Sequence, residues 1–115
     1  MIFIQTSKVH GQGVFTDKSI KEGEVIERCP FLTIASDHVN DECILHDYVF
    51  GSYDDNEIFV VLGYGMIYNH SNEPNAEWFV PDCGSFIQFE AIKNINAQEE
   101  IFHDYGMEYW NSRNM

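Results

Sequence analysis

The sequence has few basic residues. Its 6 lysine and arginine residues are outnumbered by 19 aspartate and glutamate residues, giving a formal net charge of −13. Because direct nucleic-acid binding needs a positive surface, we expect no nucleic-acid partner. The acidic excess fits two other roles equally well: a solubilising surface, or attraction to a partner rich in lysine and arginine.

The sequence also lacks the residue spacings of common metal and phosphate sites. Cys29, Cys43 and Cys83 are odd in number and far apart, so neither a disulfide framework nor a zinc cluster is predicted. The five histidines show no His-x-His or His-Glu-x-x-His spacing, which disfavours a metal hydrolase. No Gly-x-x-x-x-Gly-Lys loop indicates a nucleotide phosphate site. We therefore predict no metal and a reduced, intracellular setting.

Long apolar runs are missing as well. No run approaches the ~20 residues that span a bilayer, and the first residues lack the basic start of a secretion signal. The length of 115 residues suits one small domain, and 44% hydrophobic and 15% aromatic residues suffice for a packed core. We therefore expect a single globular domain and no membrane partner.

Short β-prone runs separated by Gly, Pro, Asn and Asp predict a mostly β fold. The expected strands cover residues 2–6, 14–16, 25–28, 31–34, 58–62, 76–80, 85–91, 92–95 and 101–102. Pro81-Asp82-Cys83-Gly84 predicts a hairpin turn between two of them. Residues 41–50 are ambiguous, since Asp41 could cap a short helix while Tyr48-Val49-Phe50 looks extended.

Three short motifs stand in order along the chain. They are Gly11-Gln12-Gly13-Val14-Phe15, the segment from Asn69-His70-Ser71 to Pro74-Asn75, and Glu99 to Gly106 ending in Asp-Tyr-Gly. Each alone would fit an ordinary turn, a satisfied loop histidine or a core tyrosine. Together they resemble the motifs of SET-domain protein lysine methyltransferases, and the chain resembles the minimal stand-alone SET proteins of viruses and some bacteria.

The resemblance implies a fold and a domain organisation. The fold would be the β-clip-like SET fold, made of several small sheets, with the C-terminal segment threaded under a loop as a pseudoknot. Residues 1–115 would form a single SET domain without a pre-SET region or a zinc-binding post-SET region. Tyr109 and Trp110 would close the site in place of the missing extension, and a second subunit, as in a homodimer, is one way to complete its wall.

The resemblance also implies roles for individual residues. Tyr105 is expected to be catalytic, with its hydroxyl beside the departing methyl group. Glycines at the first motif would let the backbone approach the cofactor, with Gln12 contributing its backbone. The residues expected to bind the cofactor are Gly11, Gln12, Gly13, Tyr48, Asn69, His70 and Trp110. Those expected to line the substrate channel are Tyr48, His103, Tyr105 and Tyr109.

Some of these assignments have alternatives or depart from the family pattern. Tyr48 fits core packing nearly as well as a role in the site. Asn75 and Ser71 are expected to bond the loop itself. His103 stands where the family often has an aromatic residue that limits the number of methyl groups, so the resemblance leaves product multiplicity open.

The activity implied is transfer of a methyl group from S-adenosylmethionine to a lysine ε-amine of a basic protein, such as a histone-like tail. The product of the cofactor would be S-adenosylhomocysteine. An unperturbed lysine has a pKa of ~10.4, and burial of its stem in an apolar channel would favour the neutral amine that attacks. The alternative is a non-catalytic SET-like module that binds a basic peptide without methylating it.

Overall fold

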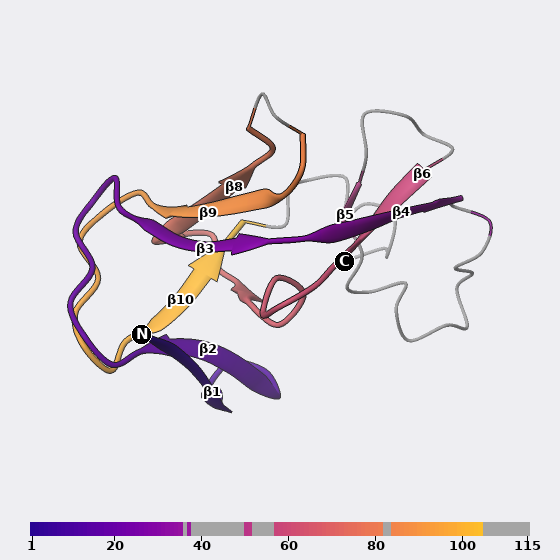
Figure 1. Cartoon of the computed structure of the whole chain (residues 1–115). Coiled ribbons are helices and arrows are strands. Elements are labelled where there is room, and N and C mark those ends of the chain that lie inside the picture. The colour runs from indigo at the N-terminus through magenta and orange to yellow at the C-terminus, as the bar shows by residue number, and fades with distance from the viewer. Residues whose placement is uncertain (36, 38–49, 52–56, 82–83, 105–115) are drawn as a thin grey trace.

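The computed structural model describes residues 1–35, 37, 50–51, 57–81 and 84–104. These residues form three small sheets, which confirms the predicted mostly β fold (Figure 1). The first sheet has the strand order β1-β2-β10-β7, the second β3-β9-β8 and the third β4-β6-β5. Their bounds are β1 Ile2–Thr6, β2 Gln12–Thr16, β3 Val25–Cys29, β4 Phe31–Ala35, β5 Phe50–Gly51, β6 Glu57–Val61, β7 Asn69–His70, β8 Ala76–Phe79, β9 Ile87–Ala91 and β10 Glu100–His103.

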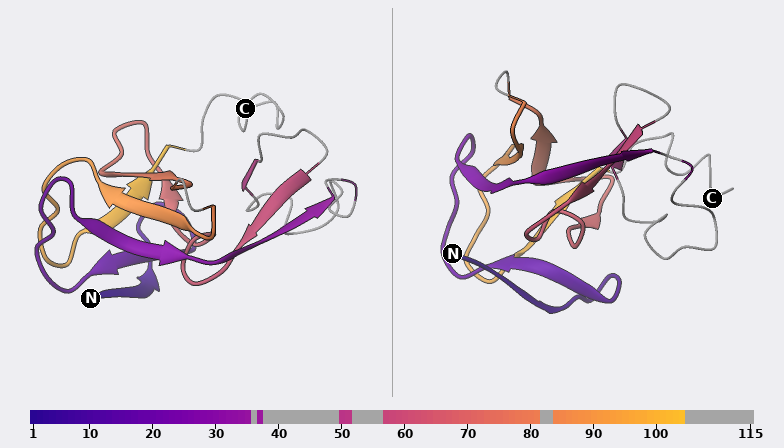
Figure 2. Two further views of the ribbon diagram at one scale, coloured as in Figure 1. Left: turned by 45° about the horizontal axis from the view of Figure 1, so that its top comes forward. Right: turned by 45° about the vertical axis from the view of Figure 1, so that its right-hand side comes forward.

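Strands β3 and β4 follow each other along one side of the molecule, interrupted at Pro30 (Figures 1 and 2). Because proline has no N–H to donate, it separates the two ladders at this point. Strand β3 pairs with β9, and β4 pairs with β6. One extended stretch therefore contributes to two different sheets.

Strand β10 lies between sequence-distant segments. It pairs antiparallel with β2 and parallel with β7, so the N-terminal, middle and C-terminal parts of the chain meet there. The predicted threading of the C-terminal segment involves residues 105–115, which lie outside the described residues.

One predicted strand is wrong. Residues 92–95 form no strand, and Ile95 makes a single bridge with Ile20. Ile95 is nonetheless 1% exposed. Its apolar character reflects burial in a turn rather than a continuous ladder, a distinction that a short apolar pattern cannot make.

The hydrophobic core lies between the sheets. Fully buried side chains come from every sheet, including Val14, Cys29, Val61, Ile87, Phe89 and Ile101. Strand β10 shows the alternation of a half-buried strand, because Ile101 and His103 are buried while Glu100 and Phe102 are half-buried. The strand thus offers one face to the core and the other to the polar cluster described below.

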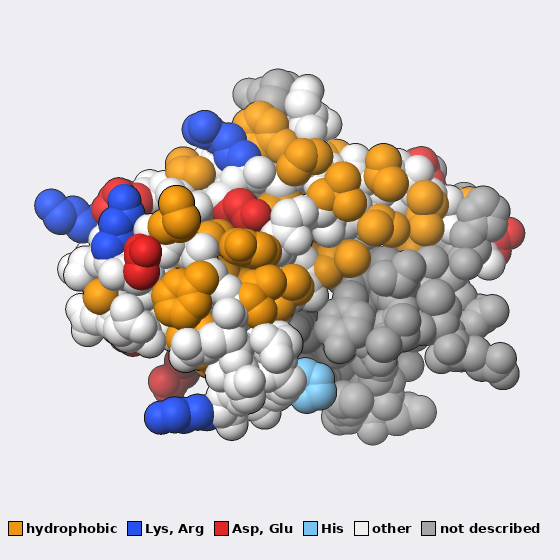
Figure 3. All heavy atoms as spheres, turned by 60° about the horizontal axis from the view of Figure 1, so that its bottom comes forward, with side chains coloured by type: hydrophobic (Ala, Val, Ile, Leu, Met, Phe, Trp, Pro, Cys, Tyr) orange, Lys and Arg blue, Asp and Glu red, His pale blue; other side chains and the backbone are white. Residues whose placement is uncertain are grey.

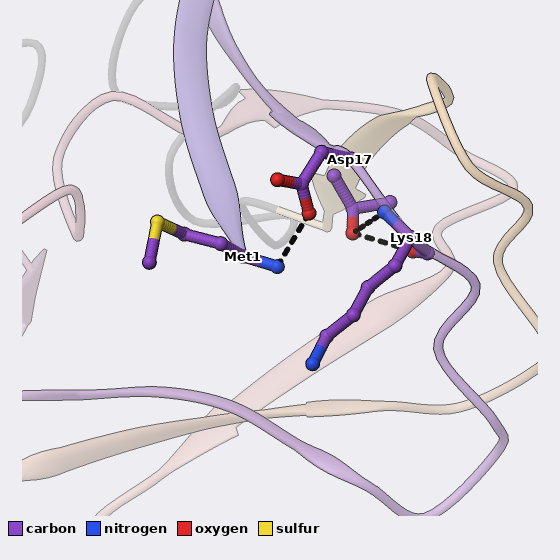
Figure 4. Close-up of polar contacts among 4 residues, drawn as sticks. Met1, Asp17 and Lys18 are labelled. Atoms are coloured by element: carbon purple, nitrogen blue, oxygen red, sulfur yellow. Dashed lines mark hydrogen bonds and ion pairs between the residues drawn. The ribbon is translucent and has the colours of Figure 1, made fainter.

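The start of β1 is tied to the end of β2. The amino group of Met1 donates to Asp17 Oδ1 at 2.6 Å, and the neighbouring Thr16 hydroxyl donates to the Lys18 carbonyl oxygen at 2.6 Å (Figure 4). The bond from the Met1 amino group lowers the pKa of Asp17. These contacts close the open end of the β1–β2 hairpin.

Charged and apolar side chains are unevenly spread over the surface. On the face in Figure 3, the lysine and arginine side chains gather toward one end and hydrophobic side chains occupy the centre. Across the described residues, the large apolar side chains with the greatest exposure include Val9 and Leu32. No helical segment of the described residues has the length and apolar character needed to cross a bilayer.

Candidate functional site

The three sequence motifs meet around strand β10. Phe15 and Val14 of the first motif face Glu100 and Ile101 across the β2–β10 ladder. Asn69 and His70 of the second motif face Phe102 and His103 in parallel register. Residues separated by tens of positions in the sequence are therefore neighbours in one sheet (Figure 1).

Asn69 is the centre of this arrangement. Its side chain is buried, and its amide nitrogen Nδ2 donates to Glu100 Oε2 at 2.8 Å, His10 O at 3.0 Å and Gln12 O at 3.1 Å. Three acceptor oxygens around one atom identify that atom as the NH₂ group, since a carbonyl oxygen there would face three oxygens. Within the described part of the chain, none of the Asn69 side-chain bonds uses the carbonyl oxygen Oδ1, which leaves an acceptor for a donor group.

The loop between β1 and β2 is bonded to the same cluster. Ser7 Oγ donates to Glu100 Oε1 at 2.7 Å and accepts the Val9 N–H at 3.0 Å. The Ser7 N–H donates to the Gly11 carbonyl oxygen at 2.7 Å. One carboxylate, that of Glu100, thus holds both the loop and the Asn69 amide.

Gly11 and Gly13 of the first motif each require glycine for a different physical reason. Gly11 has φ +47°, a conformation that glycine adopts at low cost, and a Cβ there would meet no atom within 4 Å. At Gly13 a Cβ would collide with Glu100 Oε2 and lie 3.2 Å from Asn69 Nδ2. The close approach that requires Gly13 is therefore to protein side chains, whereas the sequence analysis expected an approach to a cofactor. Gln12 is exposed, and its carbonyl oxygen accepts the Asn69 amide. Its expected contact with the cofactor stays a prediction.

His70 lies at the edge of the cluster. Its Nε2 is 3.0 Å from Asn72 Oδ1, and its Nδ1 is 3.6 Å from Asp104 Oδ1. The side chain is 15% exposed. The ring therefore sits between the loop after β7 and the end of β10.

Asn75 bonds the loop to β10, as the sequence analysis expected. Its Nδ2 donates to Glu100 O at 2.9 Å, and its Oδ1 accepts the Phe102 N–H at 2.8 Å. The Asn75 N–H also donates to Phe102 O at 3.3 Å. The side-chain amide thus acts as a peptide unit of an additional strand. Ser71 Oγ accepts the Glu73 N–H at 3.0 Å, which shapes the turn before Asn75.

His103 lies in the aromatic part of the core. Its ring centroid is 5.7 Å from those of Phe50 and Phe89 and 6.3 Å from that of Tyr68. Burial lowers the pKa of His103 to about 4, so its ring is neutral at pH 7. The expected place of His103 in the substrate channel stays a prediction.

A second polar contact beneath the site was not anticipated from the sequence. Tyr68 is 1% exposed, stacks on Phe89 at 4.3 Å and donates its hydroxyl to Glu27 Oε1 at 2.8 Å. Glu27 Oε2 accepts the Tyr64 N–H at 3.1 Å. Burial, with the nearby Glu27 charge, raises the pKa of the Tyr68 hydroxyl. Glu27 therefore anchors the segment that leads into Asn69.

The remaining candidates lie outside the described residues. They are Tyr48, Tyr105, Tyr109 and Trp110. Two residues of the cluster, Ser7 and Glu100, were not singled out by sequence reasoning. Glu100 stands inside the third motif, directly before the apolar Ile101, and an acidic residue within a β-strand pattern is the signal that could have drawn attention to it.

The cluster around Asn69 offers hydrogen-bond acceptors rather than positive charge. Carbonyl oxygens, the Asn69 Oδ1 and the Glu100 carboxylate are acceptors, and the described residues contain no lysine or arginine hydrogen-bonded to them. Such a set suits a cation or a neutral donor and disfavours a phosphate, which needs N–H donors or basic side chains. Among the described residues there is also no group of three metal-binding side chains.

Comparison with known proteins gives a consistent result. A SET domain family model matches residues 11–106. A curated histone-lysine N-methyltransferase of Schizosaccharomyces pombe, specific for H3 lysine 37, is 24% identical over 110 residues, covering 93% of this chain and 74% of that protein.

Two solved structures resemble this chain in fold. A crystal structure of a candidate histone methyltransferase from Plasmodium falciparum superposes with a TM-score of 0.77 at 34% identity, covering 95% of this chain and 96% of that one. The polycomb repressive complex 2 of Chaetomium thermophilum contains a chain with a TM-score of 0.76 at 25% identity, covering 92% of this chain and 15% of that longer one.

Proposed function

Because the chain belongs to the SET domain family, we propose that it is a protein-lysine N-methyltransferase that uses S-adenosylmethionine. The family assignment supports methyl transfer, and the Schizosaccharomyces pombe relative is named for methylation of a histone lysine. We extend the proposal to residues 1–115 acting as one SET domain, with a lysine-containing basic protein as substrate.

The observation that carries the proposal is the orientation of Asn69. Its amide nitrogen is turned into the protein by Glu100, His10 and Gln12, and its Oδ1 is left as an acceptor. S-adenosylmethionine supplies the transferable methyl group on a cationic sulfur and carries an ammonium group. Asn69 Oδ1 fits that ammonium group, since an ammonium has donors and no acceptor.

The remaining assignments follow the family motifs. Gly11, Gln12 and Gly13 form the proposed cofactor loop beside Asn69, and His70 contributes through its backbone and ring position. Tyr48 and Trp110 would contact the cofactor, while Tyr109 and His103 would bound the lysine channel. Tyr109 and Trp110 are proposed to shield the site, with a second subunit able to add to the wall.

Tyr105 is the proposed catalytic residue. Its hydroxyl would orient the lysine amine toward the methyl group as displacement proceeds. An apolar channel would hold the amine in its neutral form, because desolvation disfavours the ammonium form. The net charge of −13 would favour encounter with a basic protein, and a histone-like tail is the substrate class that fits.

The test is methyl transfer to basic proteins. Core histones and other lysine-rich proteins, incubated with the protein and S-adenosylmethionine, should gain mass increments of methylation on lysine, detected by mass spectrometry. Tyr105→Phe should lower turnover about tenfold or more while cofactor binding is kept, because one hydroxyl acts mainly in the transition state.

Two other outcomes would contradict the proposal. Tight S-adenosylmethionine binding in calorimetry without methylation of any basic protein would favour the non-catalytic peptide-binding module. Equal turnover of wild type and Tyr105→Phe would remove Tyr105 from the mechanism.

A further inference from the structure

We propose that Glu100 is the positioning residue that fixes the orientation of the Asn69 amide and of the loop from Ser7 to Gly13, and thereby the affinity for the cofactor. This inference rests on the proposed function and names a residue of the same site. It is carried by the contacts of one carboxylate with two segments that are far apart in the sequence.

The two oxygens of Glu100 have different partners. Oε1 accepts the Ser7 hydroxyl at 2.7 Å, and Oε2 accepts Asn69 Nδ2 at 2.8 Å. The positions are separated from Glu100 by 93 and 31 residues, respectively. Both distances are those of strong hydrogen bonds, and bonds to an ionised carboxylate are stronger than neutral ones.

The orientation of Asn69 depends on this carboxylate. A side-chain amide can rotate by half a turn and exchange its oxygen and nitrogen positions. At Asn69 the inward position faces the Glu100 carboxylate and two carbonyl oxygens, so the NH₂ group is held there and Oδ1 is directed away from them. Without Glu100 the charged acceptor is lost, and the preference for this orientation weakens.

The position of the loop depends on it as well. The Ser7 hydroxyl that donates to Glu100 also accepts the N–H groups of Val9 at 3.0 Å and His10 at 3.4 Å. Loop and amide therefore share one support. The arrangement also requires glycine at position 13, because any Cβ there would displace the Glu100 carboxylate.

Three Glu100 variants test the proposal. The probe is S-adenosylhomocysteine, which keeps the ammonium group but has no charge on its sulfur, titrated into the full-length protein by calorimetry. Glu100→Ala should weaken binding about tenfold or more, since both hydrogen bonds that hold Asn69 and Ser7 are lost. Glu100→Gln should stay within about threefold of wild type, because it keeps an acceptor for Asn69 and a donor that Ser7 Oγ can accept. Glu100→Met fills the same space without an acceptor and should behave like Glu100→Ala, which keeps the test valid if the alanine variant unfolds.

A double-mutant cycle separates positioning from general weakening. Because Glu100 acts through both Asn69 and the loop, Glu100→Ala in an Asn69→Ala background should cost clearly less affinity than Glu100→Ala alone, and the remainder reports the loop. In methylation assays the effect should appear in the KM for the cofactor, with kcat at saturating cofactor changed less than about twofold. Glu99→Ala is the matched control, because this neighbouring carboxylate accepts the Asn96 N–H at 2.7 Å and should not affect binding.

Several results would overturn the inference. Wild-type affinity in a folded Glu100→Ala or Glu100→Met protein would show that the carboxylate is not needed. Equal losses in the Gln and Ala variants would assign the effect to charge rather than orientation, and additive losses in the cycle would uncouple Glu100 from Asn69. Failure of the wild-type protein itself to bind S-adenosylhomocysteine would instead contradict the proposed function.

Discussion

Asn69 and Asn75 stand at the two ends of one segment beside β10, and the protein uses them differently. Asn75 engages both of its amide atoms with the backbone of β10, so its hydrogen-bonding capacity there is committed to the fold. Asn69 engages its nitrogen with three protein oxygens, while Oδ1 is not used in those bonds. The first region builds the strand, and the second carries the candidate site.

The two histidines facing each other across β7 and β10 also differ in their surroundings. His103 is 4% exposed and surrounded by aromatic rings, whereas His70 borders Asn72 and Asp104 near the surface. Residue type alone therefore does not separate a structural role from a functional one. The partners of each polar atom do.

The largest expected effect is on the structural side. Asn75→Ala removes partners from the half-buried Phe102 N–H and Glu100 C=O, and each unsatisfied group costs about 1–3 kcal/mol, so we expect a loss of about 2–4 kcal/mol in the free energy of unfolding. Urea denaturation followed by circular dichroism measures it. Ser71→Ala, which removes a bond to an exposed N–H, is the control with a small effect. An unchanged midpoint in Asn75→Ala would break the comparison.

His103 sharpens the comparison through pH. Because burial lowers its folded-state pKa to about 4 from the ordinary value of 6.5, the unfolded chain binds a proton that the folded chain does not as the pH falls through this range. Stability is therefore fully present above pH 6.5 and decreases toward pH 4, by up to about 3 kcal/mol.

The measurement is the difference between wild type and His103→Phe in unfolding free energy from pH 7 to 4.5. His70 and Asp104, which also influence His103, are common to both proteins. The wild type should lose more stability than the variant as the pH falls. Parallel pH profiles would mean that His103 is not buried in its neutral form.

The smallest expected effect lies on the site side. Asn69→Ala should weaken S-adenosylmethionine binding by ~1–3 kcal/mol, since a polar partner of the cofactor is lost. Its effect on unfolding should be smaller than that of Asn75→Ala, because His10 and Gln12, whose carbonyl oxygens lose their partner, are exposed, and the Glu100 carboxylate keeps its bond with Ser7. Calorimetric titration and urea denaturation of the same variant give both numbers. Equal cofactor affinity in variant and wild type would remove Asn69 from the site.

Most strands could be predicted from the sequence because their β-branched and aromatic runs alternate or are wholly apolar. Strands β1, β3, β4, β6 and β9 agree with expectation to within one or two residues. The two-residue strands β5 and β7 are too short for any pattern to identify. Strand β7 exists because β10 supplies its partner, and that contact joins residues about thirty positions apart.

The candidate site was predictable only in part. Gly13 and Asn69 stand in recognisable motifs, but the reason for Gly13 became visible only with Glu100 beside it. The only local signal at Glu100 is a charge within a β-strand pattern, and Ser7 in a turn has none, so neither identifies its partners. Their roles come from partners that the sequence does not place nearby.

The mostly β character, the three motifs and the acidic balance follow from the sequence alone, because they depend on local pattern and composition. The fold sets the partners of each polar atom: Asn75 bonds the backbone of β10, Asn69 bonds the Glu100 carboxylate, and His103 packs among aromatic rings. The physical reason is that a hydrogen bond depends on distances of about 3 Å. Only the folded protein brings the Ser7 hydroxyl and the Asn69 amide within that distance of the Glu100 carboxylate.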